Sequence, residues 1–188
     1  MKKLIVAAAV ALSALPAFAA EVAGVKLDDK VNVAGADLVL NGAGVRSKFG
    51  LAKVYVAGLY VSAKTKDADA VVNAKQQRRV QLVMKRDVDA DKMLEAFKEG
   101  ITANTSATEL TALQPKIAKL EAIFKAVREV REGDIINLDF AADGATKITV
   151  RNQPKEVIPG ADLSSALLRI WLGSKPVQDD LKKSLLEG

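Results

Sequence analysis

Three residues that lie close together in the chain have the chemistry to hold an anion. Arg46 follows Gly42 and Gly44, and Lys53 and Tyr55 come a few positions later. Residues two apart on a β-strand share a face, so Lys53 and Tyr55 should point the same way. A guanidinium fork beside a phenol hydroxyl suits a carboxylate. The pattern predicts a ligand-binding site of Arg46, Tyr55 and Lys53, with Arg46 as its principal charge.

The elements around Arg46 are expected to be a glycine-broken turn and a long apolar strand. Gly42 and Gly44 permit positive φ and close approach of another backbone, so they predict a turn that carries Arg46. Residues 51–61 then alternate as a strand with two mostly apolar faces, and both faces should be covered. The structural alternative is that Arg46 pairs with a carboxylate and only fixes the turn.

The absent residue types exclude many enzyme classes. The chain contains no histidine and no cysteine, so it has no Ser-His or Cys-His nucleophile and no His/Cys zinc site. No carboxylates cluster at helical spacing, and Gly42 and Gly44 lack the spacing of a phosphate-binding loop. We therefore expect neither a metal nor a cofactor.

Composition predicts one globular domain. The 188 residues are 49% hydrophobic and 27% charged, with a net charge of +5. Basic residues are scattered among acids and are not interleaved with aromatic side chains, so nucleic-acid binding is not expected.

The first 19 residues have the pattern of a secretory signal peptide. Lys2 and Lys3 precede an apolar run, and a small-residue cleavage site ends at Ala19. We expect a signal peptide over 1–19, a single domain over 20–188 and a periplasmic or secreted mature protein. No later apolar run is long enough to span a membrane, so no span is expected in the mature chain.

The rest of the chain predicts an α+β fold with antiparallel pairing. Apolar alternation indicates strands, and helical spacing with caps indicates helices beginning after Asp89 and at Asp162. Asp143 and Gly144 form a strong hairpin signal, and Pro176 suits the first turn of a last helix. The strands are expected within 25–40 and at 51–61, 79–85, 135–141 and 146–151, and the helices at 89–101, 115–130, 162–173 and 176–186.

Three segments resemble the bacterial branch of the chalcone isomerase-like family: GAGVR, KVYVAGLYV and ADLSSALLRIWLGSKPVQDDLKKSLL. The resemblance covers nearly all of the chain after the first twenty residues. It implies an open-faced β-sandwich, in which a large antiparallel sheet is backed by a layer of helices, with a ligand cleft between them. Plant members cyclise chalcones to flavanones in that cleft, whereas related members bind fatty acids without known catalysis.

The resemblance carries over only part of the plant site. The arginine that holds the substrate phenoxide is matched by Arg46, and the neighbouring threonine by Tyr55. An asparagine and its neighbour are replaced by Lys92 and Met93, and a late serine or threonine by Ile170. Losing donors aimed at developing charge commonly costs about 10² or more in rate each, which argues against flavonoid cyclisation.

Three functions remain open at the level of sequence. The leading one is an exported, non-catalytic binder of a small amphipathic anion such as a fatty acid, held at Arg46. The alternative is an isomerase or intramolecular lyase on an unidentified chalcone-like substrate, with Arg46 stabilising an oxyanion and Tyr55 as general acid. The second alternative is a structural or partner-binding domain in which Tyr55 packs and Arg46 is ion-paired.

Overall fold

A seven-stranded antiparallel sheet forms the centre of the protein. The computed structural model describes residues 20–48 and 50–187, so the predicted signal peptide lies outside the described residues. The strand order is β11-β10-β9-β6-β5-β4-β3, and every neighbouring pair is antiparallel. The strands are β3 (Lys30–Val33), β4 (Ala36–Lys48), β5 (Ala52–Val61), β6 (Arg78–Met84), β9 (Ile135–Phe140), β10 (Thr146–Val150) and β11 (Gln153–Ile158).

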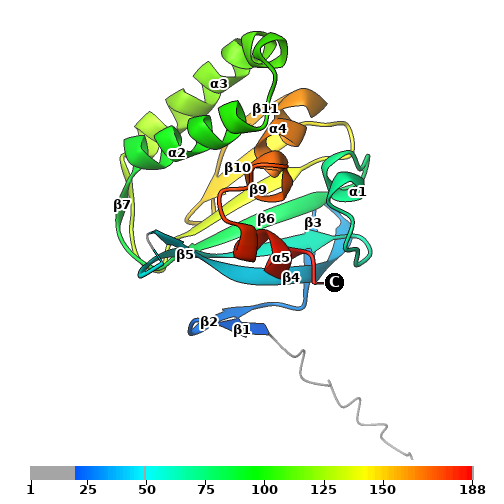
Figure 1. Ribbon diagram of the computed structural model, residues 1–188, viewed down its shortest axis with the longest axis vertical. Coiled ribbons are helices and arrows are strands. Elements are labelled where there is room, and N and C mark those ends of the chain that lie inside the picture. Colours follow the sequence, from blue (N-terminus) through cyan, green and yellow to red (C-terminus); the bar gives the residue numbers. More distant parts are fainter. Residues whose placement is uncertain (1–19, 49, 188) are drawn as a thin grey trace, which may run out of the picture.

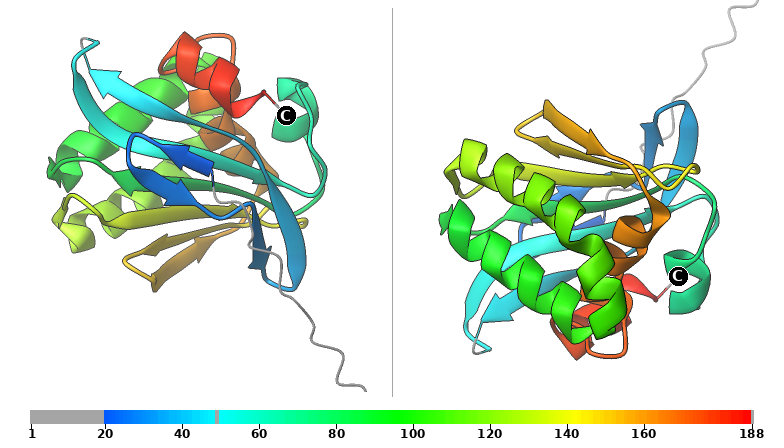
Figure 2. Two further views of the ribbon diagram at one scale, coloured as in Figure 1. Left: turned by 90° about the horizontal axis from the view of Figure 1, so that it is seen from below. Right: turned by 90° about the horizontal axis from the view of Figure 1, so that it is seen from above.

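Helices cover one face of this sheet, as the α+β prediction requires (Figure 1). Figure 2 shows α2 and α3 side by side as the outermost layer, and α5 lies against β4. Across the described ranges 20–48 and 50–187, no helix is both long and apolar enough to cross a bilayer. The helices are α1 (Ala68–Val72), α2 (Ala90–Ala103), α3 (Ala107–Val127), α4 (Ala161–Leu172) and α5 (Asp179–Leu185).

A small hairpin covers the opposite face of the sheet. It consists of β1 (Ala20–Val22) and β2 (Val25–Leu27), and it lies across the sheet in Figure 2. A second two-stranded ribbon pairs β7 (Val88–Asp89) with β8 (Glu129–Val130), next to the start of α2 and the end of α3.

Strand β5 separates two hydrophobic cores. Tyr55, Ala57 and Leu59 face the helices and belong to the main core, whereas Val56 and Tyr60 belong to a smaller core with Leu27 of the hairpin. The period of two in this strand places alternate side chains on opposite faces. The prediction that both faces of this strand are covered is confirmed.

Two local signals in the sequence form the predicted structures. Asp89 caps α2, since its carboxylate accepts a hydrogen bond of 2.9 Å from the backbone N–H of Asp91. Asp143 and Gly144 form the turn between β9 and β10, with φ of 88° at Gly144.

The predicted turn at Gly42 and Gly44 is wrong. Both glycines lie inside β4, and the chain turns only after Lys48. Their role is close approach, because a Cβ on Gly42 would lie 2.1 Å from the backbone oxygen of Ser184 in α5. Glycine in a strand interior is typical of a place where another backbone comes near.

The predicted start of the longest helix is also wrong. Helix α3 begins at Ala107 and continues through Pro115. Ser106 and Glu109 form a capping box there, in which each side chain accepts a hydrogen bond from the other residue's backbone N–H. The helix ends at Val127, so the expected extension to residue 130 is replaced by β8.

The starts of the last two helices differ from the prediction. Helix α4 has Gly160 as its N-cap, and Asp162 lies in the first turn, where it pairs with Lys116. Helix α5 begins at Asp179, so Pro176 belongs to the preceding loop. Five short elements were not predicted: α1, β1, β7, β8 and the edge strand β11. Pro154 is tolerated in β11 because an edge strand has one unpaired side.

Candidate ligand-binding site

Arg46 and Tyr55 are directly opposite each other on neighbouring strands. They are Cα partners in the β4–β5 ladder, and such partners project from the same face of a sheet. That face is the one that the helices cover, because Tyr55 belongs to the main core. Lys53 lies exposed beyond an irregularity in the ladder, and it forms no hydrogen bond or ion pair with Arg46 or Tyr55. The structure thus brings Arg46 and Tyr55 together and leaves Lys53 apart.

Arg46 is a partly buried cation that donates hydrogen bonds to uncharged oxygen atoms. Its Nη1 donates to the backbone oxygen of Ser47 and, over 3.3 Å, to Oε1 of Gln178. Among residues 20–48 and 50–187, no carboxylate forms an ion pair with it. The ion pair that the structural alternative requires is therefore not found in the described chain.

Arg78 is a buried arginine that also forms no ion pair within residues 20–48 and 50–187, and the fold uses its donors. Arg78 donates from Nη1 to the carbonyl oxygens of Val71 and Val72, at 2.9 and 3.1 Å, and from Nε to that of Gln76. Burial lowers the pKa of its guanidinium. Arg78 thus stabilises the end of α1, whereas the Arg46 acceptors found in the described ranges are uncharged.

Tyr55 offers its hydroxyl proton to the site. The residue is only 6% exposed, and the indole N–H of Trp171 donates to its hydroxyl oxygen over 3.0 Å. An indole can only donate, so the Tyr55 hydroxyl is the acceptor in this bond and keeps its own proton for another partner. Burial raises the pKa of Tyr55 to about 12, partly offset by Trp171 and Arg46, so the phenol is neutral at neutral pH.

The apolar wall behind Tyr55 is closely packed. Phe97 of α2 meets Trp171 and Phe124 edge-on, with ring centroids 5.7 and 5.3 Å apart. Two surface cavities, of about 660 and 290 Å³, are lined by residues other than Arg46 and Tyr55. The space behind Tyr55 is therefore filled by aromatic side chains of α2, α3 and α4.

Gln178 is a site residue that the sequence analysis missed. Its Nε2 donates to the carbonyl oxygen of Val45, and its Oε1 accepts from the N–H of Ser47, at 3.2 and 3.0 Å. The side-chain amide thus pairs with β4 as a neighbouring strand would. No spacing or motif marks a single glutamine 132 positions away from Arg46, so only the folded chain shows the pairing.

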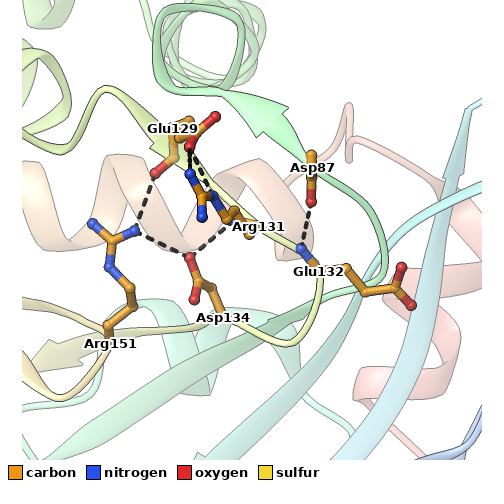
Figure 3. Close-up of polar contacts among 6 residues, drawn as sticks. All are labelled: Asp87, Glu129, Arg131, Glu132, Asp134 and Arg151. Atoms are coloured by element: carbon orange, nitrogen blue, oxygen red, sulfur yellow. Dashed lines mark hydrogen bonds and ion pairs between the residues drawn. The ribbon is translucent and has the colours of Figure 1, made fainter.

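A second group of charged residues pairs two arginines with two acids near the ends of neighbouring strands. Figure 3 shows Asp134 accepting from the backbone N–H of Arg131 at 2.9 Å and from Arg151 at 3.4 Å. Arg131 also pairs with Glu129 over 2.7 Å. Arg131 and Arg151 pair with Glu129 and Asp134, so these contacts hold β8, the start of β9 and the β10–β11 turn together. In the part of the chain that the structure describes, no three acidic side chains gather as a metal site.

The plant-type positions do not add polar groups to the site. Lys92 is exposed on α2, and Met93 is buried in the main core. Ile170 is also buried, and it packs so closely on α2 that a Cβ on Gly100 would lie 2.9 Å from Ile170 Cγ2. The side-chain hydrogen bonds of Arg46 and Tyr55 go instead to Gln178 and Trp171.

Comparison with known proteins agrees with this architecture. The structure is similar to that of the Arabidopsis thaliana fatty-acid binding protein AtFAP1, with a TM-score of 0.71 and 14% sequence identity over 87% of this chain and 92% of that one. No curated protein matches the chain in sequence. The family model described as chalcone isomerase-like matches residues 19–187, which is nearly the whole sequence. The chain therefore belongs to the chalcone isomerase-like family.

Proposed function

We propose that this protein is an exported, non-catalytic binder of a small amphipathic anion, such as a fatty acid, whose carboxylate is held by Arg46 and Tyr55. The observation that carries the proposal is the pairing of these two residues. Arg46 forms no ion pair within residues 20–48 and 50–187, and it lies opposite a neutral phenol whose oxygen accepts from Trp171 and whose own proton is left for a ligand. Both groups donate hydrogen bonds, and a carboxylate accepts them. The likeness to a protein described as fatty-acid binding supports the choice of ligand.

The energetics favour affinity from the apolar tail and orientation from Arg46. Burying twelve methylenes contributes roughly 10 kcal/mol at about 0.8 kcal/mol each. A charge-assisted hydrogen bond adds about 1.5 to 3 kcal/mol. Association costs about 4 to 15 kcal/mol, so binding at about micromolar concentration is expected.

The neutral phenol favours binding over catalysis. A general acid works best with a pKa near the working pH, and the pKa of Tyr55 is about 12. The O–H of Tyr55 therefore stays in place as a hydrogen-bond donor. The alternative of an isomerase would require turnover of a chalcone that depends on both Arg46 and Tyr55.

The test is native mass spectrometry of residues 20–188 purified from an exporting host, with extraction of any bound molecule. We expect a fatty acid on the wild type and at least tenfold less on Arg46→Ala. Arg86→Ala is the matched control, because Arg86 is an exposed arginine and the change in charge is the same. Equal loading of all three proteins would contradict the role of Arg46, and ligand-free wild type that stays empty with added fatty acid would contradict the proposal.

Export is proposed on the signal-peptide pattern of residues 1–19 and is tested separately. We expect the intact mass of the protein from a periplasmic extract to match a chain that begins at Ala20. A full-length mass with cytoplasmic retention would contradict export and leave the binding proposal unaffected.

A further inference from the structure

The uncharged side-chain oxygen of Gln178 accepts hydrogen bonds from two donors of the proposed anion site. Its Oε1 accepts from the backbone N–H of Ser47 at 3.0 Å and from Nη1 of Arg46 at 3.3 Å. This oxygen is held from the other side as well, because Nε2 of the same amide donates to Val45. Two donors that converge on one oxygen are the arrangement by which proteins hold one oxygen of a carboxylate.

The helix that follows Gln178 fills a trough floored by glycine. Gly42, Gly44 and Arg46 alternate along the inner face of β4, so the floor beside Arg46 has no side chains for two positions. Leu181 and Leu185 of α5 lie in this trough, fully buried, and a Cβ on Gly44 would lie 2.9 Å from Leu181 Cδ1. The trough is therefore an apolar groove that begins at the proposed anion site.

We infer that α5 with Gln178 is an intramolecular occupant of the ligand site, which the bound molecule displaces. The amide oxygen of Gln178 stands where a carboxylate oxygen would bind, and Leu181 and Leu185 fill the place of the acyl chain. This inference rests on the proposed function. It assigns the tail to the Gly42–Gly44 trough and makes the apparent affinity depend on how well α5 competes.

The charges and the size of α5 make this exchange feasible. A carboxylate brings a full negative charge to Arg46, and charge-assisted hydrogen bonds are about twice as strong as those to a neutral amide oxygen. Exposing Leu181 and Leu185 to water costs free energy. Burial of the acyl chain on the same glycine floor offsets that cost. Helix α5 has only seven residues, and Gln178 gives it no side-chain cap, so its own local stability is small.

The test compares two substitutions of Gln178 that act in opposite directions. Dodecanoate is titrated calorimetrically into residues 20–188 of each variant. Gln178→Ala removes the competing oxygen, so we expect dodecanoate to bind about 3 to 10 times more tightly than to wild type. Gln178→Glu provides an internal carboxylate beside Arg46, so we expect binding at least about 10 times weaker. Gln153→Ala, an exposed glutamine on β11, should leave the affinity unchanged.

A second measurement follows α5 itself. We expect amide hydrogen exchange in residues 174–187 to become faster when dodecanoate binds, while exchange in β4 and β5 slows. In an Arg46→Ala background, the difference between Gln178→Ala and Gln178→Glu should disappear. Dodecanol, which has the same chain and no charge, should bind Arg46→Ala and wild type alike.

Three results would overturn the inference. If Arg46→Ala loses dodecanoate but Gln178→Ala binds like wild type, the proposed function stands and the competing role of Gln178 is wrong. Slower exchange in residues 174–187 on binding would show that α5 closes over the ligand. If neither wild type nor Gln178→Ala binds dodecanoate, the proposed function falls and this inference with it.

Discussion

Trp171 donates its indole N–H to the hydroxyl of Tyr55 over 3.0 Å, and this bond joins α4 to β5 inside the main core. Tyr60, five residues further along β5, is the opposite case. Its hydroxyl is buried in the smaller core and has no hydrogen-bond partner. One strand thus carries a satisfied and an unsatisfied tyrosine on its two faces, which provides a matched pair for experiments.

Removing the two hydroxyls should change stability in opposite directions. Tyr55→Phe leaves the Trp171 N–H buried without an acceptor, so we expect a loss of about 1 to 2 kcal/mol. Tyr60→Phe removes an unpaired polar atom, so we expect a gain of up to about 1 kcal/mol. Urea unfolding followed by tryptophan fluorescence measures both. Destabilisation by Tyr60→Phe as large as that by Tyr55→Phe would contradict this assignment.

Stability should fall in alkaline solution because of the tyrosines. Burial raises the pKa of Tyr55 to about 12 in the folded chain, and burial also raises that of Tyr60. The unfolded chain loses these protons near pH 10, so their contribution is complete below pH 10 and is lost as the pH rises toward 12. Each tyrosine should cost up to about 1.4 kcal/mol per pH unit in that window.

The control for this pH dependence is Tyr55→Phe. Its free energy of unfolding, measured in urea between pH 8 and 11.5, should fall less steeply with pH than that of wild type. Between pH 10 and 11.5 the difference in slope should correspond to about one proton released on unfolding. Parallel curves for the two proteins would show that Tyr55 titrates alike in the folded and unfolded chains.

Arg78 should be essential for stability and not for binding. Arg78→Ala leaves the carbonyl oxygens of Val71 and Val72 without their donor and opens space beside Phe140, so we expect a loss of about 2 to 4 kcal/mol. Arg78→Lys should rescue only part, because a lysine cannot donate from a fork to both α1 and Gln76. Thermal unfolding measures the loss, and dodecanoate titration of the folded variant should give the wild-type affinity.

The glycine trough can be tested with single methyl groups. Gly42→Ala places a Cβ 2.1 Å from the Ser184 oxygen, and a backbone atom cannot rotate away, so α5 must shift. We expect a loss of more than about 2 kcal/mol and rapid hydrogen exchange in residues 179–187. Gly50→Ala meets no neighbour, so it should cost only about 1 kcal/mol through its φ of 70° and leave α5 protected.

Much of this fold could be predicted because its signals are local. The alternation in β5, the cap at Asp89 and the turn at Asp143 each depend on a few adjacent residues. The capping box of Ser106 and Glu109 is equally local, but the apolar spacing alone predicted a helix that begins only at residue 115.

The rest of the site depends on residues that meet only after folding. Gly42 and Gly44 predict a turn by composition, and their real neighbour is a helix about 140 positions away. Arg46 and Tyr55 were predicted as site residues from their chemistry and the family resemblance. Trp171 of α4 reaches Tyr55, and Gln178 of the following segment reaches Arg46, only in the folded chain. Arg78 is in phase with Val80, Leu82 and Met84 on the apolar face of β6, which would have marked it as buried.

Asn41 connects two segments that are far from it in the chain. Its Nδ2 donates to the backbone oxygens of Thr65 and of Leu185, the latter 144 positions away, at 2.9 and 2.7 Å. Most sheet neighbours are hairpin partners that close short loops, but this contact spans nearly the whole domain. The chain must lose the entropy of closing this long loop before the contact contributes any stabilising free energy, and such non-local contacts slow folding. The docking of α5 on β4 is therefore expected to be the last and slowest step by which the native protein forms.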